Sequence, residues 1–218
     1  MRNDPQLQSD VRAELRYDPS IDDTDVRVAV ADGVVTLTGT VPSFADKLAA
    51  AHAVERVFGI RAVANDLAVA VPIHLEQPDT AIAKAVVNAL EWDVLVPGQN
   101  VKSSVSDGWV TLEGRVEWRY QRDAAARAVH NLSGVRGVTN NIIVVAKPVA
   151  ELDVSRSIKE ALERRADRTA EHIHVQAIDG VVTLTGSVPS FGDRRAAEGA
   201  AWSASGVTDV RDELIVKV

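Results

Sequence analysis

The sequence predicts an α+β protein made of three tandem αββαβ domains, each a small three-stranded mixed sheet with two helices on one face. A short string occurs three times, as DGVVTLTGTVPSF, DGWVTLEGRVEWR and DGVVTLTGSVPSF, starting at Asp32, Asp107 and Asp179. In every copy a later glycine follows the glycine of the string by 26 positions, at Gly59, Gly134 and Gly206. Chance does not keep such a register, so the repeat sets the architecture.

The repeat divides the 218 residues into domains at 1–71, 76–147 and 150–218. A unit of about 70 residues buries only about 60% of the surface that its unfolded chain exposes. We therefore expect contacts between the domains. The exposed strand edges of such small sheets also allow a homo-oligomer.

Each copy begins with an apolar stripe at intervals of four residues, which predicts one face of an amphipathic helix. The stripe consists of Leu7, Val11 and Leu15 in the first copy, Ile82, Val86 and Leu90 in the second, and Val154, Ile158 and Leu162 in the third. An aspartate precedes each stripe, at Asp4, Asp79 and Asp153. Because carboxylates accept hydrogen bonds from the free amides of a helix start, we expect these aspartates to cap the helices.

A hairpin follows the first helix. Alternating apolar residues such as Val26, Val28 and Val30 predict a strand with one buried face. An Asp-Gly pair then favours the positive backbone torsions of a tight primed turn, so the next run returns as the second strand. The pairs are Asp32-Gly33, Asp107-Gly108 and Asp179-Gly180. Within that second strand stand Gly39, Gly114 and Gly186, where glycine permits a bulge or a close packing contact.

An alanine-rich segment after the hairpin predicts a second helix that packs closely on the sheet. Its small residues in the first copy are Ala49, Ala50 and Ala53. Gly59, Gly134 and Gly206 then fit a left-handed helix stop, and a last apolar strand follows. A hairpin followed by a right-handed crossover places both helices on one face and leaves the other face of the sheet open.

The composition excludes several classes of site and partner. The chain has no cysteine, which excludes disulfides, thiolate metal sites and a thiol nucleophile. Its formal charge of −7 repels phosphate backbones, so we expect no nucleic-acid partner. No stretch approaches the roughly 18 apolar residues of a transmembrane helix, and the first residues lack the apolar core of a signal peptide. We expect a soluble cytoplasmic protein, or a periplasmic one if a leader has been removed.

The repeated pattern of an Asp-Gly turn, the run Val-Thr-Leu-x-Gly-x-Val, a helix, a glycine and a final strand resembles the BON domain. The final strand reads VANDLAV from Val63, VTNNIIV from Val138 and VRDELIV from Val210, so Asp212 replaces the asparagine of the other copies. This family is named for bacterial osmotically inducible and nodulation proteins. The resemblance covers nearly the whole chain, and it implies the αββαβ fold and a non-enzymatic, ligand-binding role. It also implies an association with phospholipid surfaces, osmotic stress or envelope maintenance, and some cytosolic relatives bind potassium.

The repeated polar residues do not predict catalysis. Asp32, Asp107 and Asp179 are explained by the turn, and no nucleophile with its base or pair of cleft carboxylates accompanies them. His172 and His174 share one side of a predicted strand, at a spacing that could meet a metal ion. Neither histidine repeats in the other copies, so a solvated pair is the favoured interpretation. We expect no enzymatic activity, no cofactor and no metal centre.

The central copy has the one unusual surface. Where its sisters read VPSF it reads VEWRYQR, which concentrates Trp118, Arg119, Tyr120 and Arg122 at the start of its second helix, with Arg115 just before. Trp109 points by alternation to the open face of the sheet, and Trp202 lies off the alanine stripe of its own helix. Because aromatic and arginine side chains are typical of interfaces and lipid headgroup regions, these seven residues are candidates for binding a lipid or a partner. The favoured interpretation is that the aromatic residues of the central copy seal it against its neighbours, because a middle repeat has two flanks to cover.

Three functions stay open from the sequence alone. The first is a module of the osmotic or general stress response that binds a phospholipid surface or an envelope protein. The second is a sensor that binds a cation such as potassium. The third is a scaffold that associates with itself through exposed sheet edges.

Overall fold

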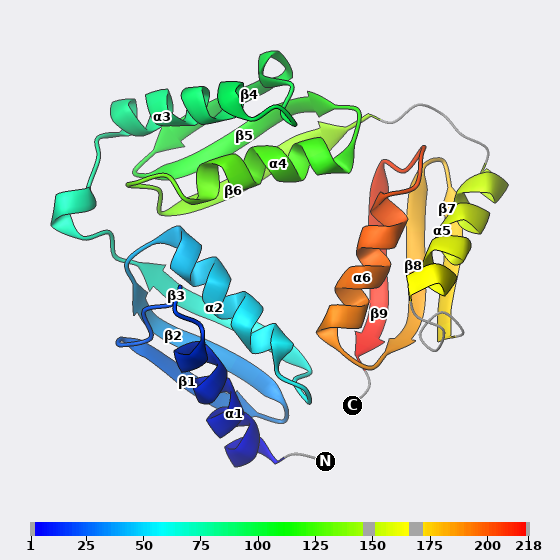
Figure 1. The fold of residues 1–218 in the computed structure, drawn as a ribbon, viewed down its shortest axis with the longest axis horizontal. Coiled ribbons are helices and arrows are strands. Elements are labelled where there is room, and N and C mark those ends of the chain that lie inside the picture. The colour runs from blue at the N-terminus through cyan, green and yellow to red at the C-terminus, as the bar shows by residue number, and fades with distance from the viewer. Residues whose placement is uncertain (1–2, 146–150, 166–171, 217–218) are drawn as a thin grey trace. The chain divides into compact units, whose positions relative to one another are not determined.

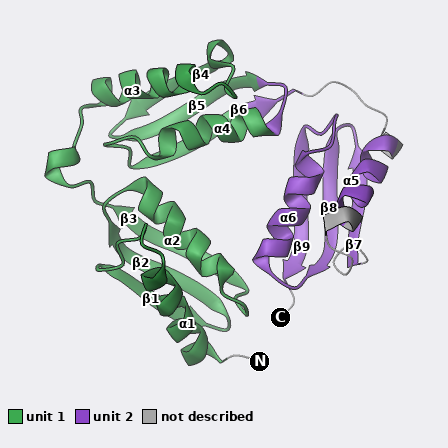
Figure 2. Cartoon of the chain, viewed as in Figure 1, with its two compact units in different colours: residues 1–115, 120–142 green, residues 116–119, 143–218 purple. Residues whose placement is uncertain are grey.

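The computed structural model describes residues 3–145, 151–165 and 172–216. These residues form three separate three-stranded sheets, which confirms the predicted α+β class and the triplicated architecture. The chain divides into two compact units, residues 1–115 with 120–142 and residues 116–119 with 143–218 (Figure 2). The first unit therefore holds the first repeat and most of the second. The second unit holds the third repeat and two short pieces of the second, at residues 116–119 and 143–145.

All three repeats run helix, strand, strand, helix, strand (Figure 1). The first consists of α1 (Asp4–Tyr17), β1 (Val26–Ala31), β2 (Val34–Val41), α2 (Phe44–Arg56) and β3 (Ala62–Val69). The second follows the short helix η1 (Ile73–Leu75) and consists of α3 (Asp79–Trp92), η2 (Gly98–Asn100), β4 (Val101–Ser106), β5 (Trp109–Val116), α4 (Arg119–His130) and β6 (Gly137–Val144). The third consists of α5 (Glu151–Arg165), β7 (Ile173–Ile178), β8 (Val181–Val188), α6 (Phe191–Trp202) and β9 (Asp209–Val216).

The second strand of each repeat lies in the middle of its sheet. In the first repeat β1 pairs with β2 in antiparallel fashion, while β3 lies parallel to β2 on the other side. The third repeat has the same arrangement, in which β7 and β9 flank β8. A tight hairpin and a helical crossover produce this mixed sheet, as the sequence predicts.

One face of each sheet is buried against both helices. In the first repeat the helix stripe of Leu7, Val11 and Leu15 is at most 2% exposed, and Val35 and Leu37 of β2 are fully buried. Ala50 and Ala53 of α2 are also fully buried, because their small side chains let the helix lie close to the sheet. The equivalent stripes of α3 and α5 are buried too. Burial of this kind contributes roughly 25 cal/mol per Å² and is the main stabilising term of each small domain.

The three hairpin turns have the same backbone geometry. Both residues of every Asp-Gly pair have positive φ, with Asp32 at 51° and Gly33 at 74°, Asp107 at 52° and Gly108 at 76°, and Asp179 at 48° and Gly180 at 77°. These torsions define a primed turn whose twist matches that of the flanking strands. The turn thus accounts for aspartate and glycine at these positions.

The aspartates at the helix starts do not cap their own helices, which corrects the expectation from the sequence. The carboxylate of Asp79 accepts hydrogen bonds from the backbone N–H groups of Asp107 and Gly108, at 2.8 and 2.9 Å. Asp4 holds the first turn in the same way, and the cap of α1 is Asn3. In the third repeat Asp153 instead pairs with Arg156 of its own helix.

The glycines inside the second strands are explained by the approach of another backbone segment. A Cβ on Gly39 would lie 2.0 Å from the carbonyl oxygen of Asp25, and one on Gly186 would lie 2.0 Å from that of His172. Gly114 meets the carbonyl oxygen of Asn100 at 2.1 Å in the same way. All three also have positive φ, from 115° to 149°, and so do the glycines after the second helices, Gly59, Gly134 and Gly206.

Within the described residues, no helix has the length and apolar character needed to cross a membrane.

Candidate interaction surface

The open face of the central sheet is the candidate interaction surface. Alternation along β5 places Trp109, Glu113 and Arg115 on the face away from the helices, since the intervening Val110 and Leu112 are buried. Lys102 of β4 lies opposite Glu113 in the strand register and is exposed. Ile143 of β6 is also exposed. We call Lys102, Trp109, Glu113, Arg115 and Ile143 the central open face.

Trp109 is held in a defined position on this face. Its indole Nε1–H donates a 2.8 Å hydrogen bond to the hydroxyl of Thr139. The ring also lies against Gly137, because a Cβ at that glycine would be only 2.4 Å from the ring atom Cζ3. Half of the tryptophan side chain nevertheless remains exposed. Sequence reasoning missed Gly137. Its sequence signal is that this position, at the start of the last strand, is glycine in the second repeat alone, since the first and third repeats have Ala62 and Asp209 there.

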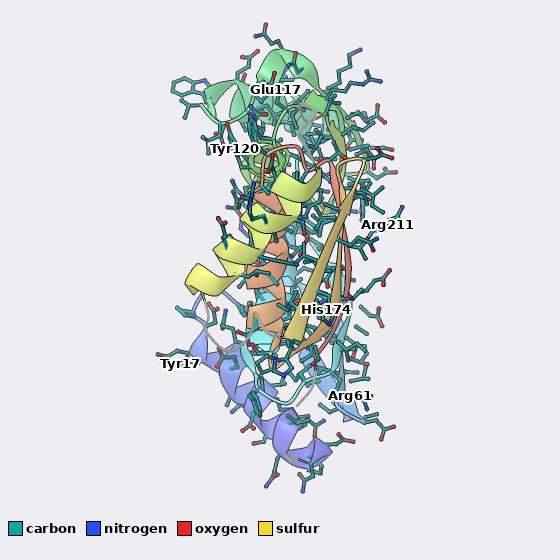
Figure 3. All side chains as sticks on the ribbon, turned by 90° about the vertical axis from the view of Figure 1, so that its right-hand side faces the viewer. Tyr17, Arg61, Glu117, Tyr120, His174 and Arg211 are labelled. Carbon is teal, nitrogen blue, oxygen red and sulfur yellow. The ribbon has the colours of Figure 1, made fainter. Side chains whose placement is uncertain are left out.

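The remaining candidates do not converge with Trp109 on one pocket. Arg115 lies six residues further along β5, which corresponds to about 20 Å in an extended strand. Trp118 and Tyr120 follow at the corner between β5 and α4, where Trp118 is 37% and Tyr120 is 50% exposed. Figure 3 labels Tyr120 and Glu117 at this corner. The structure therefore divides the predicted surface into an open sheet face and a separate corner.

Arg122 ties its helix to the last strand. Its guanidinium donates to the carbonyl oxygen of Asn140 at 3.3 Å, and the Asn140 side chain donates back to the carbonyl oxygen of Arg122 at 2.9 Å. The first repeat makes an equivalent link through Lys47 and Asn65, and the third through Arg194 and Asp212. An arginine that fills the same role as its counterparts in the other repeats is explained by packing.

Arg119 and Trp202 contact each other in the second unit. The guanidinium carbon of Arg119 lies 4.3 Å from the centroid of the Trp202 ring, which is cation–π geometry. The same guanidinium is 3.8 Å from a carboxylate oxygen of Glu198, and this carboxylate also accepts a hydrogen bond from the Trp202 indole at 3.2 Å. Two residues predicted as separate candidates thus form one cluster with an acid that sequence reasoning missed.

A groove of about 500 Å³ in the first unit lies beside the turn of the second repeat. Its lining includes Glu76, Asp79, Gly134 and Arg136. Arg136 pairs with Glu76 at 3.6 Å, and Asp79 is engaged with the turn amides. Because these charged groups are satisfied by one another and by backbone, they support the junction between η1 and the second repeat.

The histidine pair of the third repeat does not form part of a metal cluster. His172 and His174 are both exposed, and His174 projects from β7 in Figure 3. Across residues 3–145, 151–165 and 172–216 no three His, Cys, Asp or Glu side chains are grouped to hold an ion. The described residues thus offer two kinds of candidate site, namely exposed faces of the sheets and contacts between neighbouring segments.

Comparison with known sequences gives the family. The sequence model of the BON domain matches residues 3–71, 78–146 and 151–218, so it covers each repeat in turn. The chain belongs to the BON domain family. A relative among characterised proteins is osmotically-inducible protein Y of Escherichia coli (strain K12), which is 31% identical over 144 residues. This match covers 64% of the chain and 72% of the relative.

Two solved structures of the chlamydial secretion protein CdsD also align with this BON protein. One is the C-terminal domain of CdsD, a structural protein of the type III secretion system of Chlamydia trachomatis, with 15% sequence identity and a TM-score of 0.28 over 100% of both chains. The other structure of CdsD is 16% identical with the same TM-score of 0.28, over 97% of this chain and 92% of that one.

Proposed function

We propose that this protein is a binding protein of the osmotic stress response that associates with phospholipid surfaces through its central open face. The stress role rests on the three BON domains and on the similarity to osmotically-inducible protein Y. The observation that carries the surface is Trp109, which is half exposed yet fixed by Thr139 and Gly137. A tryptophan that is already ordered loses little side-chain entropy on binding.

The chemistry of the central open face fits the headgroup region of a bilayer. Tryptophan prefers the boundary between headgroups and acyl chains, where its ring is in an apolar setting and its N–H meets polar groups. Ile143 adds exposed apolar surface on the same sheet, and Lys102 and Arg115 supply cations for anionic headgroups, with one acid, Glu113, opposite Lys102. The chain as a whole carries −7 and is repelled by an anionic membrane at long range, so the attraction must be local.

The other two open faces are poorer candidates. The position of Trp109 is occupied by Val34 in β2, which is 38% exposed, and by Val181 in β8. The rest of the outward side of β2 consists of Thr36, Thr38 and Thr40. A threonine face offers little apolar area to a bilayer, so we assign membrane contact to the central repeat.

Co-sedimentation with anionic vesicles tests this function. The intact protein is expected to sediment with vesicles of phosphatidylcholine and phosphatidylglycerol at low salt and to be released as the salt concentration rises. Trp109→Ala should lower the partition coefficient by roughly tenfold, because a buried tryptophan contributes more than 1.4 kcal/mol. The control is Val34→Ala at the equivalent position of the first repeat, which should bind as the unaltered protein does.

Two results would contradict the proposal. Absence of sedimentation of the unaltered protein at low salt would remove the lipid function and direct attention to an envelope protein as partner. Equal binding by Trp109→Ala and Val34→Ala would show that the central open face is not the contact surface. The predicted cytoplasmic location and the non-catalytic role are part of the proposal, and cell fractionation tests the location.

A further inference from the structure

The last strand of each repeat has an outer edge that side chains block. An edge strand presents unpaired N–H and C=O groups, which can pair with a strand of another chain. In the first repeat the Asn65 side chain accepts from the amide of Leu67 at 3.3 Å, and the Lys47 ammonium donates to the carbonyl oxygen of Leu67 at 2.7 Å. The other two repeats block this edge in a similar way, through Asn140 with Arg122 and through Asp212 with Arg194.

The first strand forms the opposite edge of each sheet, and a side chain of the first helix blocks it in two repeats. In the first repeat the Gln8 side chain of α1 donates to the carbonyl oxygen of Val28 in β1 at 2.6 Å. In the third repeat the Ser155 hydroxyl of α5 donates to the carbonyl oxygen of Val175 in β7 at 3.3 Å. Each of these carbonyl groups points away from the middle strand, so it is one of the groups that an added strand would use.

The central repeat lacks this bond. Ala83 of α3 stands where the other repeats have their donors, directly after the first residue of the buried stripe. Ser103 of β4 stands where they have the accepting carbonyl group, opposite a leucine of the middle strand. Alanine has no side-chain donor. In the part of the chain that the structure describes, the outer edge of β4 is therefore the sheet edge that no such bond blocks.

The side of α3 next to this edge is apolar as well. Val87 lies one turn beyond the alanine, on the same side of the helix, and is 47% exposed. The other repeats have charged residues at this position, Arg12 and Lys159. The connection between α3 and β4 adds Val94 and Leu95, which are 96% and 47% exposed. An open strand edge and exposed apolar side chains thus occur together in the central repeat.

We propose that the edge of β4 binds an extended segment of another protein, which adds a fourth strand to the central sheet next to α3. Alternation sets the chemistry of this segment. Its residues opposite Val101, Ser103 and Val105 lie on the helix side of the sheet, where Val87 is exposed, so they are apolar. Its intervening residues lie on the open face beside Lys102, so they are polar or acidic. This site goes beyond the lipid contact proposed above, because it uses the strand edge and α3.

A second copy of this chain fits the edge of β4 poorly. Paired strands are about 4.8 Å apart, whereas packed helices are about 8–10 Å apart. Because α3 packs against β4, pairing of two β4 strands would bring the two α3 helices closer than helices can pack. An extended segment carries no helix, and its alternating side chains can cover Val87.

Fluorescence anisotropy with a synthetic peptide tests the proposal on the full chain. The probe is a fluorescein-labelled peptide of alternating valine and threonine, with glutamate in place of one threonine. The control peptide has proline in place of the central valine, which removes an N–H donor and opposes strand pairing. The protein should bind the control at least roughly tenfold more weakly than the probe. Equal affinity for the two peptides, or no binding of the probe, would overturn the proposal.

Exchanges of residues between the repeats test where the probe binds. Ala83→Gln installs the donor of the first repeat and should weaken binding by roughly tenfold, because the carbonyl group of Ser103 is then occupied. The converse change, Gln8→Ala with Arg12→Val, opens the edge of β1 and should create a second site for the probe. Ser155→Gln keeps the third repeat closed and is the control that should leave binding unchanged. Unaltered affinity in Ala83→Gln, or no second site in the converse variant, would contradict the proposal.

Hydrogen exchange measured by NMR on the unaltered chain keeps the test decisive if a variant fails to fold. The amides of Ser103 and Val105 point to the open edge, so the probe should slow their exchange. The amides of Val28 and Val175, at the blocked edges, should exchange as before. Unchanged exchange at Ser103 and Val105 in the bound state would refute the site. Slow exchange there without the probe, together with a dimer that forms as the protein concentration rises, would show that a second copy occupies the edge and would also contradict the proposal.

Discussion

The hairpin turns of the three repeats have the same residues, whereas the ends of their second helices have different ones. Every turn has an Asp-Gly pair with nearly identical backbone torsions. The last position of the second helix is filled by His130 in α4 and Trp202 in α6, and the equivalent residue of α2 is Glu55. Positions that set backbone geometry are thus repeated, whereas the side chains at the ends of the second helices have diverged. A triplicated domain can keep one fold and still carry different chemistry at the ends of its helices.

The largest effect is expected at the glycines that set backbone geometry, and a pair of substitutions in the third repeat tests them. Gly186→Ala should destabilise that repeat by about 3 kcal/mol or more, because its Cβ would collide with the carbonyl oxygen of His172 and its φ is 122°. Gly199→Ala is the matched control in α6, where a Cβ would meet nothing within 4 Å. This control should stabilise the helix by roughly 0.5–1 kcal/mol.

Urea unfolding followed by the amide NMR signals of β8 measures both glycine variants in the same repeat. Equal stability of Gly186→Ala and Gly199→Ala would show that the backbone at Gly186 is not constrained as the structure indicates.

A second prediction concerns the clamp on the turn of the central repeat. Asp79→Ala removes a carboxylate that accepts two backbone hydrogen bonds at 2.8 and 2.9 Å. The expected loss is about 2 kcal/mol in the free energy of unfolding of this repeat, because hydrogen bonds to charged groups are stronger than neutral ones. Glu91→Ala on the same helix is the control and should change stability by less than about 0.5 kcal/mol. Fast hydrogen exchange at the amides of Asp107 and Gly108 should accompany the loss, and unchanged exchange there would count against the clamp.

A third prediction addresses the helix ends. Arg119→Ala should weaken the cluster of Arg119, Glu198 and Trp202 by about 1 kcal/mol, because it removes the cation over the Trp202 ring and the ion pair with Glu198. Quenching of tryptophan fluorescence by acrylamide reports the exposure of Trp202, provided that Trp92, Trp109 and Trp118 are replaced by phenylalanine. Arg119→Lys keeps the charge and should retain part of the protection. Equal quenching before and after Arg119→Ala would contradict the contact.

The smallest effect is expected at the link between the second helix and the last strand. Asp212→Asn should change the stability of the third repeat by less than about 1 kcal/mol, since the ion pair with Arg194 is partly exposed and asparagine can bond the helix carbonyl instead. Asn65 and Asn140 do this in the other repeats, at 2.9 Å in each case. Asp212→Ala has no such replacement and should cost more in a thermal unfolding measurement. A larger loss of stability for Asp212→Asn than for Asp212→Ala would contradict the prediction that asparagine can replace aspartate at this link.

The sequence predicts what depends on local patterns. The helix stripes, the primed turns and the order of elements follow from periodicity and from the Asp-Gly pair, so they could be read without a structure. The position of Trp109 on the open face also follows, because alternation along a strand fixes the side on which a residue lies.

Contacts between distant segments were not predictable in the same way. The clamp from Asp79 to the turn joins residues 28 positions apart, and helix-cap propensity alone gives the wrong partner. The contact between Phe44 and His130 depends on how two repeats meet, which no periodicity encodes. A comparison of equivalent positions at the helix ends could have suggested these residues as a group, although not their pairing.

Double-mutant cycles on the two side-chain contacts at the ends of the second helices test the structure most directly. One cycle combines Phe44→Ala with His130→Ala, the other combines Arg119→Ala with Trp202→Ala, and a control cycle combines Phe44→Ala with Glu91→Ala. Measured by urea unfolding at neutral pH, each contact cycle should show a coupling free energy of about 0.5–1.5 kcal/mol, and the control should be additive. Additive effects in either contact cycle would contradict the side-chain contact that it tests.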